Sequence, residues 1–304
     1  MAVSAKKYRQ SLRATGSFYT DARLAESIMR EVECMDEAYD PTCGRGNLLA
    51  IFPVDCRKYG QEIDESALAE ARERLTNFEG VLGNTLTNPA FMDRRFKSIV
   101  ANYPFSVKWE PQKDERFAEL PTLPPPSKAD WAFIAHCYYM LADGGTASIL
   151  CFPGVLYRGN REQAVREWFV KNKTIRKVIS FEGGFFEDTN IATALLVLQK
   201  GVVNDTILFT DHESGLEREV PVDEVLKNDG NLSVNVYVSP KPKPKEEADP
   251  WLLELNCRHV MKEKLRKDIA QSQMVCLLEG WKLDTFLDEL QTVIDKFRSD
   301  KTKK

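Results

Sequence analysis

Two short segments carry the residue types that can do chemistry in this 304-residue chain. The first is Asp40–Gly46 (DPTCGRG), which follows the short extended run 37–40 and precedes residues 46–52, which can start a helix. Gly44 and Gly46 permit positive φ and let a ligand approach where a Cβ would block it. A strand, glycine turn and helix in this order indicate a nucleotide-like cofactor site at the carboxyl edge of a sheet, although a plain tight turn is the alternative.

The next two predicted strands also end in polar side chains. Strand 59–64 delivers Glu62, which is placed to accept hydrogen bonds from both hydroxyls of a ribose, as in dinucleotide-binding folds. The alternative is that Glu62 or Asp64 caps the helix 65–75, and for Asp64 we favour that reading. Strand 80–83 leads into Asn84, whose amide can bond an adenine ring, although by itself it is an ordinary turn residue.

The second chemical segment is Asn102–Phe105 (NYPF), which follows the predicted strand 96–101. The exocyclic amine of adenine is a poor nucleophile, because its lone pair is delocalised into the ring. The Asn102 side-chain oxygen and the Tyr103 carbonyl can accept both of its hydrogens, and the Phe105 ring can stack on a base turned out of a duplex. Orientation and preorganised electrostatics suffice for transfer of an already activated methyl group. An ordinary strand-to-turn Asn-X-Pro is the alternative.

These motifs, in this order, resemble the N6-adenine DNA methyltransferases, and among them the modification subunit of type I restriction systems. The resemblance covers about residues 13–238 and extends through five further segments, which are 16–20, 127–133, 154–159, 184–193 and 231–234. It implies a Rossmann-like methyltransferase fold, adenine N6 methylation of double-stranded DNA, and S-adenosylmethionine as cofactor. No nucleophilic side chain is implied.

The resemblance also implies individual roles. The cofactor residues would be Tyr19 and Thr20 at its methionine portion, Asp40 at its amino group, Pro41, Thr42, Gly44 and Gly46 in the loop, Glu62 at the ribose and Asn84 at the adenine. Asn102, Tyr103, Pro104 and Phe105 would form the catalytic motif. Phe186 would stack on the other face of the target base, with Phe185 as the fallback.

Two positions depart from the family pattern. Tyr103 stands where Pro is usual, and it preserves the backbone carbonyl while changing the rigidity of the loop. Asn84 stands where Asp is common, which keeps an acceptor but loses the charge and predicts a lower cofactor affinity.

The pattern of elements predicts an α/β fold with a doubly wound, mostly parallel sheet. Further strands are expected at 146–152, 175–181 and 191–199, with the last two as a terminal hairpin, and helices at 128–142 and 161–171. We expect a catalytic domain at 1–238, a Pro/Lys-rich linker at 239–250 and a C-terminal helical appendage at 251–304.

The composition of the chain argues against two kinds of structural site. The seven cysteines are odd in number and lack a Cys-x-x-Cys pair, and His136, His212 and His259 have no ligand spacing, so we expect neither disulfides nor a metal. No leader or membrane span is recognised, which predicts a cytoplasmic protein.

The net charge of −4 is unusual for an enzyme that binds DNA without a partner protein. We expect site specificity to come from a separate specificity subunit. The C-terminal helices, with their apolar Trp281, Phe286, Leu290 and Phe297, would bind that subunit or a second copy of this chain. The alternatives are a solitary, phage-borne DNA methyltransferase and a noncatalytic assembly module that kept the cofactor fold. Methylation of glutamine or RNA by a related enzyme is a third.

Overall fold

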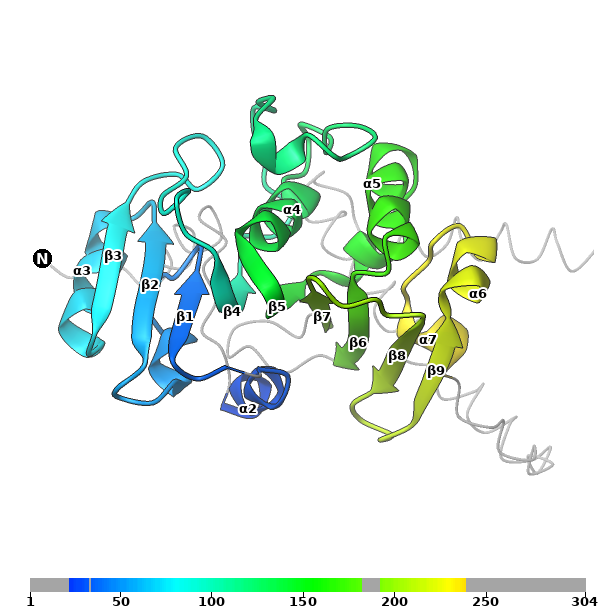
Figure 1. The fold of residues 1–304 in the computed structure, drawn as a ribbon, viewed down its shortest axis with the longest axis horizontal. Coiled ribbons are helices and arrows are strands. Elements are labelled where there is room, and N and C mark those ends of the chain that lie inside the picture. Colours follow the sequence, from blue (N-terminus) through cyan, green and yellow to red (C-terminus); the bar gives the residue numbers. More distant parts are fainter. Residues whose placement is uncertain (1–21, 33, 182–191, 239–304) are drawn as a thin grey trace, which may run out of the picture. The chain divides into compact units, whose positions relative to one another are not determined.

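The computed structural model describes residues 22–32, 34–181 and 192–238. Nine strands form one sheet in the order β3-β2-β1-β4-β5-β7-β6-β8-β9 (Figure 1). Their bounds are β1 Glu37–Asp40, β2 Arg57–Glu62, β3 Phe78–Leu82, β4 Phe96–Asn102, β5 Leu141–Cys151, β6 Ile175–Phe181, β7 Thr193–Gln199, β8 Thr206–Asp211 and β9 Glu217–Pro221.

The first five strands in this order are parallel, whereas β7 and β9 run antiparallel to their neighbours. β1 pairs in parallel with β2 and β4, β2 with β3, and β4 with β5, whereas β7 runs antiparallel between β5 and β6. The predicted doubly wound sheet and its β6–β7 hairpin are therefore confirmed. The sequence did not reveal β8 and β9, which extend the sheet beyond β6. β9 (EREVP) buries only Val220, so it lacks the apolar alternation that signals a strand.

The helices are α2 Ala22–Arg30, α3 Glu65–Arg74, α4 Asp130–Met140, α5 Asn160–Lys171, α6 Val222–Lys227 and α7 Val234–Tyr237. The helix expected after Gly46 is only a single 3-10 turn, Leu49–Ile51. Pro53 explains the difference, because a proline disfavours helical backbone in the preceding residue, and Phe52 is extended at ψ 152°. Among the helices of the described ranges, none has the length and apolar character to cross a bilayer.

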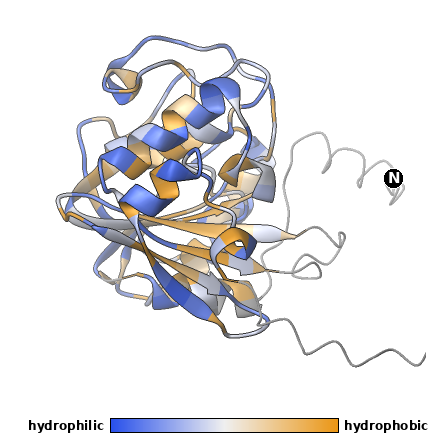
Figure 2. Ribbon diagram, turned by 90° about the vertical axis from the view of Figure 1, so that its right-hand side faces the viewer, coloured by the Kyte–Doolittle hydropathy of each residue, from blue (hydrophilic) through white to orange (hydrophobic). Residues whose placement is uncertain are grey.

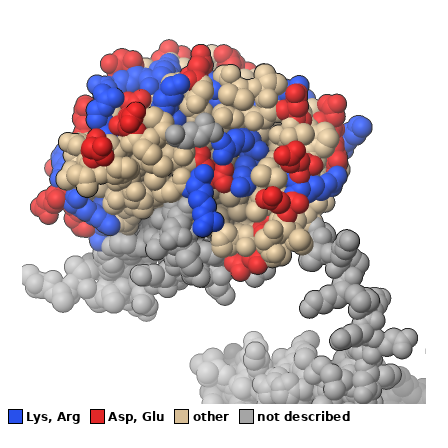
Figure 3. Space-filling model, turned by 60° about the horizontal axis from the view of Figure 1, so that its bottom comes forward, with Lys and Arg blue, Asp and Glu red and all other residues tan. Residues whose placement is uncertain are grey.

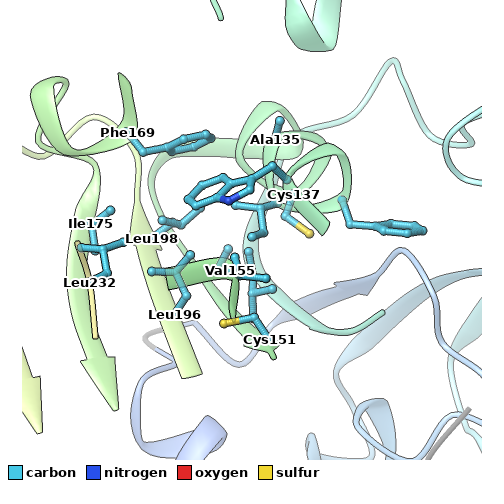
Figure 4. Close-up of a cluster of buried hydrophobic side chains, with 14 of the residues drawn as sticks. Ala135, Cys137, Cys151, Val155, Phe169, Ile175, Leu196, Leu198 and Leu232 are labelled. Atoms are coloured by element: carbon cyan, nitrogen blue, oxygen red, sulfur yellow. The ribbon is translucent and has the colours of Figure 1, made fainter. Parts of the chain in front are cut away.

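Hydrophobic side chains cover both faces of the sheet. Along β4, Ile99 belongs to one cluster and the next residue, Val100, to the other, as the alternation of strand side chains requires. The first cluster includes Phe169 of α5 together with Leu196 and Cys151 from the strands (Figure 4). The second includes residues of α2 and α3. The strands are accordingly mostly orange in Figure 2, whereas the helices also carry hydrophilic residues.

The chain separates into two units, Met1–Pro240 and Lys241–Lys304. The first contains the whole sheet. The linker and the C-terminal helices expected at 239–304 lie outside the described residues, so both remain predictions.

Candidate active site

Three of the predicted site residues lie at the carboxyl ends of neighbouring parallel strands. Asp40 ends β1, Glu62 ends β2 and Asn102 ends β4, with β1 between the other two. The register pairs Asp40 with Gly60 and Tyr39 with Ile99. The ends therefore meet at one edge of the sheet, which is where open α/β sheets bind their ligands.

The two glycines of the Asp40–Gly46 loop have different roles. Gly44 has φ +52°, and a Cβ added there would meet no atom within 4 Å. Gly46 has φ +77°, and its Cβ would lie 2.6 Å from Leu75 Cδ1. Gly46 therefore allows the loop to pack on the residue that ends α3, whereas Gly44 faces open space that a ligand can enter. Cys43 is buried against Gly60.

The Glu62 carboxylate links the ends of β1 and β2. Oε2 accepts from the Gly44 N–H at 2.8 Å, and Oε1 accepts from the N–H groups of Ile63 and Asp64 at 2.8 and 2.9 Å. A negative group is thereby fixed beside the open side of the loop. Asp64 caps α3 as expected, since its side chain accepts from the N–H groups of Ser66 and Ala67.

Asp40 is a buried acid at the base of the loop. Its Oδ1 accepts from the Thr42 N–H at 2.9 Å, while the side chain is almost inaccessible. Burial, with a smaller contribution from the negative charge of Glu62, raises the pKa of Asp40 to about 7. A positively charged group bound beside Asp40 would stabilise its ionised form.

Asn84 begins the turn that follows β3. Its side-chain oxygen accepts from the Leu86 N–H at 2.9 Å, so it holds a local turn, as its residue type alone predicts. The neighbouring Thr85 hydroxyl donates to the Pro41 carbonyl. This turn is thus attached directly to the glycine loop, and a ligand role for the Asn84 amide remains a prediction.

The Asn102–Phe105 segment turns away from the end of β4. The Asn102 side chain is partly exposed and forms no hydrogen bond within the described residues. Tyr103 points the other way: its side chain is fully buried, and its ring stacks on Phe133 of α4 at 5.1 Å between centroids. The phenol therefore lies in the core, which leaves the backbone at this position for the site. Phe105 meets the Tyr103 ring edge to face at 5.7 Å.

A buried arginine that the sequence did not identify connects the turn after β3 with the segment after Phe105. The Arg116 guanidinium donates to the carbonyls of Thr85 and Leu86, each at 2.7 Å, and pairs with Asp114 at 2.6 Å. It also contacts His136 Nδ1 at 3.2 Å. Arginine is always a donor, so Nδ1 accepts, and the neutral ring donates from Nε2 to the Tyr39 hydroxyl at 3.0 Å. Burial lowers the pKa of His136 well below its usual value, which keeps the ring neutral.

Two apolar side chains at this edge were also not predicted as site residues. Ile63 directly follows Glu62 and is 64% exposed, and Leu82 at the end of β3 is 46% exposed. Ligand pockets are mostly apolar, with a few fixed polar groups. An exposed isoleucine next to the strand-ending acid was the signal available in the sequence.

The remaining predicted residues lie outside the described ranges. These are Tyr19 and Thr20 for the cofactor, and Phe186 with its fallback Phe185 for the target base. Among the described residues, no group of three or more His, Cys, Asp or Glu side chains is arranged to hold a metal ion.

The strand order, with antiparallel β7 inserted between β5 and β6, is that of a Rossmann-like methyltransferase fold. A family profile described as N-6 DNA Methylase matches residues 5–221. The chain belongs to this family.

Two curated relatives illustrate the similarity. The type I restriction enzyme MpnII methylase subunit of Mycoplasma pneumoniae is 34% identical over 238 residues, which cover 67% of this chain and 44% of the relative. The MjaVII methylase subunit of Methanocaldococcus jannaschii is 23% identical over 299 residues, which cover 77% of this chain and 51% of the relative. The chain thus spans about half the length of the curated relatives it matches.

Solved structures agree on the fold. The methyltransferase subunit of a type I restriction-modification system from Streptococcus thermophilus superposes with a TM-score of 0.67 at 25% identity, covering 79% of this chain and 66% of that one. A chain from a study of type I restriction-modification complex assembly gives a TM-score of 0.59 at 19% identity, covering 91% of this chain and 71% of the other.

Proposed function

We propose that this chain transfers a methyl group from S-adenosylmethionine to the N6 amine of adenine in double-stranded DNA, as the catalytic part of a modification subunit. The observation that carries the proposal is the convergence of Asp40, Glu62 and Asn102 at one sheet edge. This convergence supports a cofactor loop and a pair of amine acceptors that would lie at the same edge. The relatives named as type I methylase subunits support the same assignment.

The residues present fit the cofactor. Gly44 leaves open space beside the Glu62 carboxylate, which suits a ribose, and the exposed Ile63 and Leu82 suit a flat adenine ring. Asp40 offers a carboxylate to the cofactor's ammonium group. When bound, the cofactor supplies an electrophilic methyl group on a sulfonium. Asn84, with Tyr19 and Thr20, completes the proposed cofactor set.

The target amine would be held by two acceptors. The Asn102 side-chain oxygen has no competing hydrogen bond within the described part of the chain, and the Tyr103 ring is turned into the core, so the backbone carbonyl can serve the site. Together they would draw both amine hydrogens into one plane and direct the nitrogen lone pair toward the methyl group. Phe105 and Phe186 would stack on the two faces of the flipped base.

DNA binding and sequence choice are proposed to need a partner. Positive and negative side chains are interspersed over the face shown in Figure 3, and the whole chain carries a net charge of −4. Phosphate contacts need concentrated positive charge. We propose that helices in 251–304 bind a specificity subunit or a second copy, which would add the missing contacts.

The test is transfer of tritiated methyl groups from S-adenosylmethionine to unmethylated duplex plasmid DNA, with and without the proteins encoded beside this chain. N6-methyladenine should appear at defined sites. Asn102→Ala should reduce turnover by about 100-fold or more while cofactor affinity stays the same, because the lost contact is to the base. The matched control is Asn88→Ala, which changes an exposed asparagine after β3 and should retain activity. A wild-type protein that binds cofactor but methylates no DNA with any partner would favour the noncatalytic assembly module.

A further inference from the structure

Ser106, the residue directly after Phe105, has a strained backbone. Its φ is +54°, in the left-handed region that non-glycine residues rarely adopt. Such a conformation is strained and persists only where surrounding groups hold it. The turn that follows the proposed catalytic motif therefore depends on contacts from elsewhere in the fold.

Two side chains from different elements hold Ser106. Asp130, the first residue of α4, accepts from the Ser106 N–H through Oδ1 at 3.2 Å. Arg158, in the loop between β5 and α5, donates from Nη2 to the Ser106 hydroxyl at 3.4 Å. Arg158 in turn pairs with Glu162 of α5 at 3.5 Å. Asp130 is fully buried, and its second oxygen has no hydrogen-bond partner within the described residues. The burial of this side chain therefore lowers the stability of the fold.

The other end of the segment is attached to the same helix. The Tyr103 ring stacks on Phe133, one turn along α4 from Asp130, and the Tyr103 hydroxyl is also buried without a partner in the described part of the chain. Pro104 and Phe105 therefore lie between two attachments to α4, one through an aromatic ring and one through a carboxylate. This arrangement fixes both ends of a short turn.

We propose that Asp130 and Arg158 are positioning residues that hold Ser106 in its left-handed conformation and thereby set the direction of Phe105 and of the Tyr103 carbonyl. The proposal rests on the proposed function for its effect on methyl transfer, but its structural part stands on contacts within the chain. Displacing a positioned group by about 1 Å can reduce turnover by about 100-fold.

The structural part can be tested by amide hydrogen exchange in the full chain, without any substrate. Asp130→Ala should accelerate exchange in the segment 103–109 by tenfold or more and leave exchange in β4 and β5 unchanged. Asp130→Asn keeps an oxygen acceptor and should retain slow exchange. Arg158→Ala should accelerate exchange in the same segment, whereas Arg161→Ala, an exposed arginine nearby, should not.

Unchanged exchange at 103–109 in Asp130→Ala and Arg158→Ala would overturn the proposal. Faster exchange throughout the sheet would also overturn it, because Asp130 would then only stabilise the fold. If Asp130→Ala fails to fold, Ser106→Ala decides the matter. This change removes the hydroxyl that Arg158 contacts, so Arg158→Ala should accelerate exchange in the wild-type background and add nothing in the Ser106→Ala background. A further acceleration in the double variant would overturn the role given to Arg158.

The functional part uses the methyl-transfer assay above. Asp130→Ala should lower kcat by about 10- to 100-fold with an unchanged Kd for S-adenosylmethionine, and Asp130→Asn should restore most of the rate. A fall in cofactor affinity that matches the fall in kcat would contradict a positioning role. If the wild-type chain transfers no methyl group, the proposed function fails, and hydrogen exchange still decides the role of Asp130 and Arg158.

Discussion

Asp40 is the residue through which pH should act on the cofactor site. Its pKa is raised to about 7, mainly by burial, so near neutral pH part of the population carries a neutral carboxyl group. Between about pH 4 and 7 the folded state then binds more protons at Asp40 than the unfolded state does, and the contribution of Asp40 to the free energy of unfolding falls as pH rises.

Cofactor binding should have the opposite pH dependence, because the ammonium group prefers the ionised carboxylate. We expect the affinity for S-adenosylmethionine to rise as pH increases from 6 to 7, by at most about tenfold per pH unit. Calorimetry at these two pH values measures the effect. Asp40→Asn should remove the pH dependence, whereas Asp64→Asn, which changes the exposed cap of α3, should keep it. If the cofactor affinity changes equally with pH in the wild type and in Asp40→Asn, Asp40 is excluded as the titrating group.

Glu62 should contribute both to the shape of the glycine loop and to ribose binding. Glu62→Ala removes the acceptor of three backbone N–H groups and should weaken cofactor binding by about 1–3 kcal/mol, or about 5- to 150-fold in Kd. Glu62→Gln should also weaken it, since an amide NH₂ would face one of these donors. Glu65→Ala, an exposed acid in the first turn of α3, is the control. Unchanged affinity in a folded Glu62→Ala protein would remove Glu62 from the site.

At the scale of elements, Arg116 joins parts of the site that are distant in sequence. It binds the turn that carries Asn84 and lies in the segment between Phe105 and α4. Thr85, whose carbonyl accepts from Arg116, also donates to Pro41 in the glycine loop. The glycine loop, the turn after β3 and the segment after Phe105 therefore form one connected unit.

Arg116→Met keeps much of the side-chain volume but removes the guanidinium that donates to two carbonyls and to His136 and pairs with Asp114. Removing one member of a buried charged network costs about 3–5 kcal/mol of stability. We expect the free energy of unfolding, measured with urea, to fall by an amount near this range. The control is Arg57→Met, since Arg57 is exposed and only 3.8 Å from its partner Glu37, and it should cost less than about 1 kcal/mol. If Arg116→Met lowers the free energy of unfolding by no more than Arg57→Met does, the Arg116 contacts contribute little to stability.

At the scale of the whole molecule, the sheet-containing unit has its own core. Its two clusters lie on opposite faces of one sheet and are built from residues between Leu24 and Val238. We therefore expect a protein that lacks 251–304 to fold and to bind S-adenosylmethionine as the full chain does.

The same deletion should abolish partner association and site-specific methylation if the C-terminal helices are the docking element. Size-exclusion chromatography with the neighbouring gene products and mapping of N6-methyladenine measure these two outcomes. A full chain with Trp281, Phe286 and Leu290 replaced by Ser tests the same surface without truncation. Methylation of the same sites at the same rate by the shortened protein would favour the solitary-enzyme alternative.

The sequence alone determined the class of fold and predicted which residues meet at one edge of the sheet, because these depend on local signals. Gly44, Gly46 and the tetrapeptide Asn102–Phe105 follow short strands, and side chains at the ends of parallel strands must share one edge. The pairing of β6 with β7 was predictable for a similar reason, since β7 is an almost continuous apolar run and β6 carries four apolar residues among its polar ones.

Only the tertiary structure showed the contacts between residues that are distant in the sequence. The Tyr103 ring enters the core because there is space for it beside Phe133. The roles of Arg116, Asp130 and Arg158 depend on partners 20 or more residues away in the sequence. No periodic pattern marks such contacts, because a buried polar residue is stabilised by whichever carbonyls and acids the fold brings to it. Strand β8 was missed although the buried Ile207 and Phe209 alternate along it, whereas β9 buries only Val220 and gives no such pattern. Hydrogen bonds to β6 and between β8 and β9 complete this edge of the sheet.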